Sequence, residues 1–175
     1  MRQQASARRG ISLHSAMAKV LLTRVDKGLY VAVIEAMVII EGSKIKAVGK
    51  DIEVPKGAKV IDATGKMVMP GLIDSHMHHM GAKTNMFQVE EIIRPRELEL
   101  LVKYCDFIPM DAIVAATKNG AMACFMGDKT GTIQLGKFAD IIVDGNPLAD
   151  IKVLQDVEKI KLVMLEGKVE VDTGL

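Results

Sequence analysis

Short apolar runs separated by Gly, Asp and Pro dominate the chain up to residue 75. The runs are rich in Val and Ile and are six or seven residues long, which is typical of β-strands. They cover residues 19–25, 36–42, 44–49, 58–64 and 66–71. Gly42 separates two of them and can adopt the positive φ of a tight turn, so the pattern predicts a β-hairpin there.

The middle of the chain has the periodicity of helices. After Pro95, Leu98, Leu101, Val102 and Cys105 recur at intervals of three and four residues. Residues 109–120 begin with Pro and carry an acidic residue in the first turn, as a helix start does. Asn119 and Gly120 are expected to end this helix, and residues 121–127 are expected to form a further short helix closed by Gly127.

The strand pattern returns over residues 131–136, 139–145, 159–167 and 168–171. Neither group of strands can cover two faces alone, so we expect them to pair into one discontinuous β-sandwich. The fold class is then mainly β with two or three helices. We assign residues 17–75 and 128–175 to the sandwich and residues 76–127 to an inserted segment.

Composition excludes several classes of function. The net charge is +1 and there is no Trp, so neither a polyanion-binding surface nor base stacking is indicated, and we expect no nucleic-acid partner. The apolar run 31–40 is interrupted by Glu35, far short of the about 20 residues of a membrane span. The two cysteines favour a reducing setting, and we expect a cytoplasmic protein without membrane contact.

Residues 1–16 contain three Arg, three Ser and no acidic residue. This composition suits a cleaved leader or a disordered extension, and we favour the extension. Met17 is the alternative start of the folded chain.

His76 and His78 follow an apolar run at residues 66–71. Alternate residues of an extended chain point to the same side, so the two imidazoles can share one metal ion. The candidates for a third ligand are His79, Asp74, Glu90 and Glu91. The alternative is that the histidines lie at the edge of a sheet without a metal.

Residues 68–79, VMPGLIDSHMHH, resemble the first-strand signature of the metal-dependent amidohydrolase superfamily, in particular imidazolonepropionase and the prolidase-like hydrolases. Residues 111–151 resemble the closing segment of the same superfamily. The resemblance implies a β-sandwich beside a (β/α)8 barrel, hydrolysis of amide, peptide or cyclic amide C–N bonds, and a divalent metal, with zinc expected first. It also implies that His76 and His78 are the first two metal ligands.

The chain departs from the superfamily between its two matching segments. A barrel occupies roughly 200 residues, whereas only residues 80–93 separate the histidines from the helical region. We therefore expect residues 76–127 to be a barrel remnant without the later metal ligands. Thr84 and Asn85 stand where a Thr-Asp pair would be expected, and Asn is a poorer metal ligand.

Other motifs are weaker. Residues 131–138 imitate a phosphate loop, but Phe138 replaces the required hydroxyl. Cys124 is expected to be a buried thiol, and Ser75 lacks the elbow of a serine hydrolase. Asp140 and Asp144 are expected to be solvated strand ends.

Three functions follow from these features. The chain is an impaired or inactive amidohydrolase acting ancestrally on small amides or dipeptides, or a non-enzymatic module that forms a homo-oligomer through an uncovered sandwich face. The third alternative is a chain that completes a barrel supplied by another protein.

Overall fold

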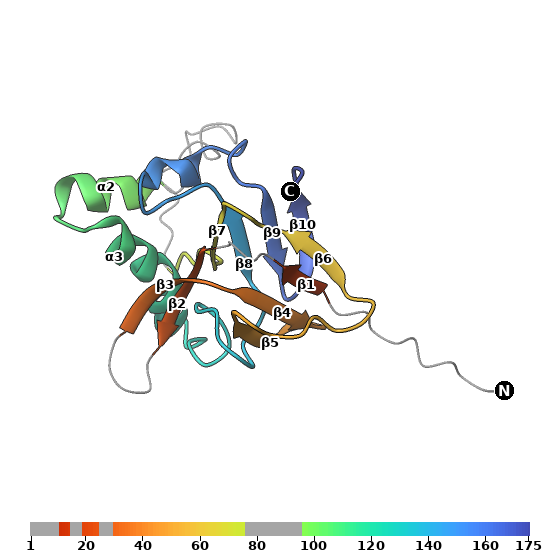
Figure 1. Ribbon diagram of the computed structural model, residues 1–175. Helices are drawn as coiled ribbons and strands as arrows, with labels where there is room; N and C mark the ends of the chain where they lie inside the picture. The colour runs from red at the N-terminus through yellow and green to blue at the C-terminus, as the bar shows by residue number, and fades with distance from the viewer. Residues whose placement is uncertain (1–10, 15–18, 25–29, 76–95) are drawn as a thin grey trace, which may run out of the picture.

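The computed structural model describes residues 11–14, 19–24, 30–75 and 96–175 (Figure 1). Its strands are β1 (Ile11–His14), β2 (Lys19–Arg24), β3 (Tyr30–Glu35), β4 (Met37–Glu41), β5 (Lys44–Gly49), β6 (Lys59–Asp62), β7 (Met67–Pro70), β8 (Ile141–Asp144), β9 (Leu162–Leu165) and β10 (Lys168–Asp172). Its helices are α2 (Arg96–Tyr104), α3 (Pro109–Val114), the π-helical turn η1 (Ala115–Asn119), α4 (Gly120–Ala123) and the 3-10 helix η2 (Ile151–Gln155).

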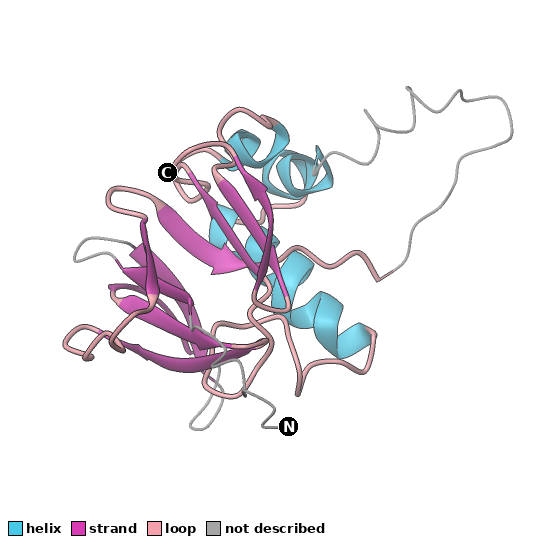
Figure 2. Cartoon of the chain, turned by 90° about the vertical axis from the view of Figure 1, so that its right-hand side faces the viewer, coloured by secondary structure: helices cyan, strands magenta, loops and turns pink. Residues whose placement is uncertain are grey.

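The strands form two sheets of mixed direction (Figure 2). One has the order β10-β9-β8-β7-β2-β3 and the other the order β5-β4-β1-β6. Most neighbours are antiparallel, but β2 runs parallel to β7 and β1 runs parallel to β6. β7 and β8 pair from Met67 opposite Asp144 to Pro70 opposite Ile141. The predicted pairing of N-terminal with C-terminal strands is therefore confirmed.

The central strands β7 and β8 of the six-stranded sheet are buried on both faces. In β8, Ile141 and Val143 belong to a cluster that also contains residues of the four-stranded sheet, such as Val38 and Ile40. We call this the inter-sheet cluster. Ile142, between them, belongs to a second cluster with Leu98 and residues of α3 and η2, which we call the helix-side cluster. Alternate residues of a strand point to opposite faces, so one short apolar strand supplies both cores.

The apolar run 31–40 is divided between the two sheets. β3 lies at the edge of the six-stranded sheet and β4 lies inside the four-stranded one. Ala36, the single residue between them, is 3% exposed. The chain crosses from one sheet to the other at this residue, which explains why the run is apolar on successive positions rather than on alternate ones.

Residues 11–14 lie within the segment that we expected to be a leader or an extension. They form β1, which pairs with β4 on one side and β6 on the other. The other residues of the segment lie outside the described part of the chain. The Arg-rich composition of residues 1–16 concealed the alternating Ile11 and Leu13, which are compatible with a strand.

Two predicted elements are corrected. Residues 131–136 are not a strand, because Gly131 and Gly136 both have a φ of +83° and bend the chain. Ile133 is buried in the inter-sheet cluster, so its apolar character reflects core packing. The helix beginning at Pro109 does not end at Asn119 and Gly120 but runs on through η1 and α4. The chain turns away at Phe125, whose φ is +56°, and not at Gly127.

The hairpin turn predicted at Gly42 is confirmed, and it touches a second hairpin turn at Gly167. Gly42 and Gly167 have positive φ values of 61° and 77°. A Cβ atom on Gly167 would lie 2.1 Å from the carbonyl oxygen of Gly42, which belongs to the other sheet. Only a residue without a side chain allows the turns of the two sheets to meet at this distance.

We expect Gly167→Ala to lower the free energy of unfolding by about 3 kcal/mol, since it adds backbone strain and a clash with main-chain atoms. Gly57→Ala is the matched control, because Gly57 also has a positive φ of 82° but no atom within 4 Å of its Cβ position. It should cost only about 1 kcal/mol. Urea unfolding of the three proteins measures both values, and equal losses would contradict the contact between turns.

Candidate functional site

The predicted metal ligands His76 and His78 lie outside the described residues. The same holds for the further positions singled out in this region, namely His79, Thr84, Asn85, Glu90 and Glu91. Asp74 and Ser75 are described and exposed, and they end the chain segment that leads to the histidines.

The segment from Gly71 to Ser75 is held at two backbone positions. The Gly71 N–H donates to the carbonyl of Asp140 at 2.9 Å, and the Ile73 N–H donates to the carbonyl of Ala116 at 2.7 Å. Leu72, between them, packs against the helix-side cluster. The chain is therefore fixed to β8 and to the π-helical turn shortly before it reaches His76.

The helix accommodates this segment closely. A Cβ atom on Gly120 would lie 2.6 Å from the carbonyl oxygen of Ile73, so glycine is required inside the helix by close packing and does not act as a helix end. The hydroxyl of Thr117 is buried and donates to the carbonyl of Ile113 at 2.7 Å. π-Helical turns recur at functional sites of proteins, and this one receives the strand end that precedes the histidine pair.

Asp140 is a structural hub and not a solvated strand end. Its carboxylate accepts hydrogen bonds from the hydroxyl of Thr130 and from the N–H of Glu166 at 2.8 Å. Together with the bond from Gly71 to its carbonyl, this residue joins the start of β8 to the end of β7 and to the turn before β10. Sequence reasoning missed this role because the partners are 10, 26 and 69 residues away.

Asp144 is also wrongly predicted as solvated. Its side chain is 0% exposed, and neither carboxylate oxygen has a hydrogen-bond partner among the described residues. Burial raises the pKa of this carboxyl from its ordinary value to about 7, because the charged form loses hydration. The signal in the sequence is the alternation along the strand. Ile142 and Asp144 are two residues apart, so the side chain of Asp144 lies on the same face as Ile142, which packs in the helix-side cluster.

Cys124 differs from its prediction too. Both Cys105 and Cys124 are free and exposed. Cys124 ends the short helix α4, next to the positive φ of Phe125, so the chain is already leaving the core at this residue.

The described residues do not fit a complete catalytic metal site. Among them, no group of three or more His, Cys, Asp or Glu side chains is placed to hold an ion. Catalytic zinc normally has three protein ligands and one open position. Likewise, no helix within the described ranges has the length and apolar character needed to cross a bilayer.

Two family models match the chain and identify its family. A model described as the amidohydrolase family matches residues 80–169, just over half of the chain, and a second model with the same description matches residues 59–97. The chain belongs to the amidohydrolase family. The second match contains the segment held by Asp140 and Ala116.

Two curated relatives match the chain over short segments. A dihydroorotase from Lactobacillus helveticus is 59% identical over 46 residues, which are 26% of this chain and 10% of that protein. Human dihydropyrimidinase-related protein 5 is 57% identical over 44 residues, which are 25% of this chain and 8% of that protein. The matched segment thus spans a tenth or less of these relatives.

Solved structures agree in fold. A protein from Bifidobacterium longum described as a prolidase superposes with a TM-score of 0.70 at 13% identity, over 96% of both chains. Another amidohydrolase superposes with a TM-score of 0.69 at 12% identity, over 93% of this chain and 99% of the other.

We expect Asp144→Asn to stabilise the protein at pH 8 but not at pH 4. At pH 4 the carboxyl is neutral in the folded state and only about half ionised in the unfolded state, so its burial costs little there. As the pH rises from about 4 to 7, the unfolded state releases its proton while the folded state retains it, so wild-type stability falls and then levels off. The variant should gain on the order of 2–4 kcal/mol relative to wild type between pH 4 and pH 8.

Urea unfolding at the two pH values measures this gain. Asp51→Asn, which changes an exposed carboxyl, is the control for the removal of one acidic group. A difference between wild type and Asp144→Asn that is constant with pH would contradict the buried, unpaired acid.

Proposed function

We propose that this chain is a shortened amidohydrolase that serves as a scaffold and has little or no hydrolytic activity. The observation that carries the proposal is the pairing of β7 with β8, which closes the six-stranded sheet directly between the N-terminal and C-terminal segments. The inter-sheet cluster gives the two sheets a shared core made of their own residues. In this proposal the two sheets are the β-sandwich of the family, which folds without a barrel beside it.

The proposal divides the chain at the ends of the sheets. Strand β1 together with residues 17–75 and 128–175 makes the sandwich, and residues 76–127 are what remains of the catalytic barrel. Three helices of this remnant, α2, α3 and α4, are described. The hydrogen bond from Gln155 to Glu99, at 3.0 Å, ties the remnant to η2 of the sandwich.

Members of this family are generally metal-dependent, and we assign His76 and His78 as the ancestral ligands of a divalent ion, with zinc expected first. The reaction of the ancestor is hydrolysis of a C–N bond in a small amide, dipeptide or cyclic amide. Only residues 79–95 lie between this pair and α2, far fewer than the roughly 200 residues of a barrel that would bring further ligands. Two imidazoles leave the ion short of the three protein ligands of a catalytic site.

A second function, self-association, is favoured by the outer surface of the helices. The face of the six-stranded sheet that we expected to be uncovered carries α2, α3 and η2 (Figure 1). Five of the eleven large apolar side chains that are exposed among the described residues lie on or beside the helices: Leu100, Tyr104, Ile108, Met122 and Phe125, with Phe125 93% exposed. Large apolar side chains left in water favour a protein neighbour, and we propose a second copy of this chain.

Metal analysis tests the scaffold proposal. We expect the protein, purified without a metal-chelating column and passed over a desalting column, to retain clearly less than one zinc per chain. We also expect no hydrolysis of dipeptides or of dihydropyrimidine-type cyclic amides above background. His14→Ala serves as the control for His76→Ala and His78→Ala. The proposal would be refuted if the wild-type protein held one zinc per chain and hydrolysed these substrates, and if only His76→Ala and His78→Ala lost the zinc.

Light scattering after size-exclusion chromatography tests self-association. We expect a dimer or larger assembly at tens of micromolar protein, and we expect Phe125→Ser to shift it towards the monomer because the variant removes the most exposed apolar side chain. Leu135→Ser, which changes an exposed apolar residue away from the helices, is the control. A wild-type monomer at this concentration would argue against the second function.

A further inference from the structure

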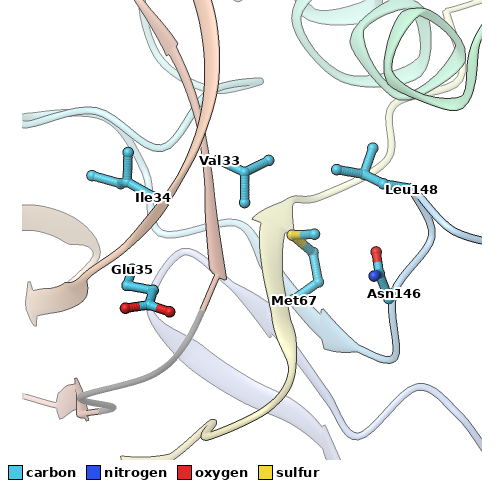
Figure 3. Close-up of a pocket in the computed structure, with 6 residues that line it drawn as sticks. All are labelled: Val33, Ile34, Glu35, Met67, Asn146 and Leu148. Carbon is cyan, nitrogen blue, oxygen red and sulfur yellow. The ribbon is translucent and has the colours of Figure 1, made fainter.

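A cavity of about 330 Å³ lies where β3, β7 and the turn after β8 meet (Figure 3). Its lining residues are mostly apolar, with two polar side chains among them: Val33, Ile34, Glu35, Met67, Asn146 and Leu148. Figure 3 shows the side chains of Val33, Met67 and Leu148 around one space, with the Asn146 amide beside them. This volume is at the lower end of the range of small-molecule sites, which are also mainly apolar with a few polar groups.

The unpaired acid Asp144 is not a lining residue of this cavity but lies behind its wall. Asp144 is the ladder partner of Met67, whose side chain forms part of the cavity wall. Residues directly opposite each other in a ladder point to the same face, with Cβ atoms about 5 Å apart. The carboxyl of Asp144 is therefore directed to the cavity side of the sheet, behind the flexible thioether of Met67.

Within the described part of the chain, the carboxylate of Asp144 lacks a hydrogen-bond donor or a cation as its partner. A buried carboxylate is only an acceptor, and leaving both of its oxygens without a donor costs several kcal/mol unless a donor or a cation arrives. Glu35, exposed on the cavity wall, adds a second acidic group. Apolar walls beside an unpaired acid suit a ligand that has a hydrocarbon body and one cationic donor group.

Among the described residues, the charged groups on the neighbouring elements leave Asp144 without a partner. Lys161 directly precedes β9, the strand beside β8, and its ammonium group donates to the carbonyl of Glu158 at 2.7 Å. On the other side, Lys19 of β2 is opposite Glu35 in the ladder, and β7 separates β2 from β8. On η2, Lys152 forms an ion pair with Glu99 at 3.4 Å. β7 offers Met67, which has no donor.

We propose that this cavity binds a small primary ammonium ion with an alkyl body, whose N–H groups donate to Asp144 and whose alkyl chain contacts Val33, Met67 and Leu148. The Met67 side chain turns aside to admit the ammonium group. The site is separate from the histidine pair, and its occupation does not depend on a metal.

The proposal predicts a pH dependence with a definite sign. Only the ionised carboxylate attracts an ammonium ion, and burial raises the pKa of Asp144 to about 7. The ionised fraction then grows about tenfold between pH 6 and pH 8, and the apparent affinity grows by the same factor. Alkylammonium ions remain charged over this range.

The test is a titration of the full chain with n-butylammonium chloride, followed by two-dimensional NMR of the backbone amides at pH 6 and pH 8 and constant ionic strength. We expect saturable shifts of amides at residues 33–35, 67, 144–146 and 148, with a dissociation constant about tenfold lower at pH 8. The neutral analogue 1-pentanol should bind at least tenfold more weakly at pH 8 and show no pH dependence.

Variants decide which groups form the site. Asp144→Asn keeps the shape of the side chain and should weaken butylammonium binding at least tenfold at pH 8, whereas Glu35→Gln should change it about threefold or less. Val33→Phe fills the cavity without changing its charge and should abolish binding. Absence of saturable binding to wild type, or equal binding by wild type and Asp144→Asn, would overturn the proposal.

Discussion

The ladder between β7 and β8 is the constraint on which the rest of the structure depends. It joins residues 67–70 to residues 141–144, so two segments separated by the helices become neighbours in one sheet. Their alternating side chains then supply both cores, with Val68 and Val143 in the inter-sheet cluster and Met69 and Ile142 in the helix-side cluster. Without this ladder, the C-terminal strands β8, β9 and β10 would have no neighbour in the six-stranded sheet.

Local patterns predicted most of the strands because strand periodicity and turn glycines act over a few residues. Gly42 and Gly167 turn their hairpins as their neighbours indicate. The errors occur where distant contacts decide. Ile133 is apolar because it enters the core, although its segment is bent by two glycines, and Gly120 lies inside a helix because Ile73 passes against it. The helix-breaking tendency of glycine is overridden by tertiary packing.

The sequence could predict which residues carry the chemistry of the candidate site, but not the contacts that support them. The His76 and His78 pair is visible as letters, but the support for the segment before it comes from Asp140 and Ala116, which are remote in sequence. Asp144 was misjudged because a strand-end Asp is usually solvated, whereas this strand is buried to its last residue. Thus the chain retains the strand end that leads to the histidine pair. The unpaired carboxyl of Asp144 lies elsewhere, behind Met67 in the wall of the cavity.

Hydrogen exchange of the native protein tests most directly whether β7 and β8 hold one self-contained unit together. The amides of Val68 and Met69, those of Ile141 to Val143, and those of Val38 to Ile40 in the other sheet should exchange only through global unfolding, with the same free energy as urea unfolding gives. Exchange of the β8 and β9 amides with a markedly lower free energy than the β4 amides would show that the two ends of the chain fold separately, and it would contradict this account.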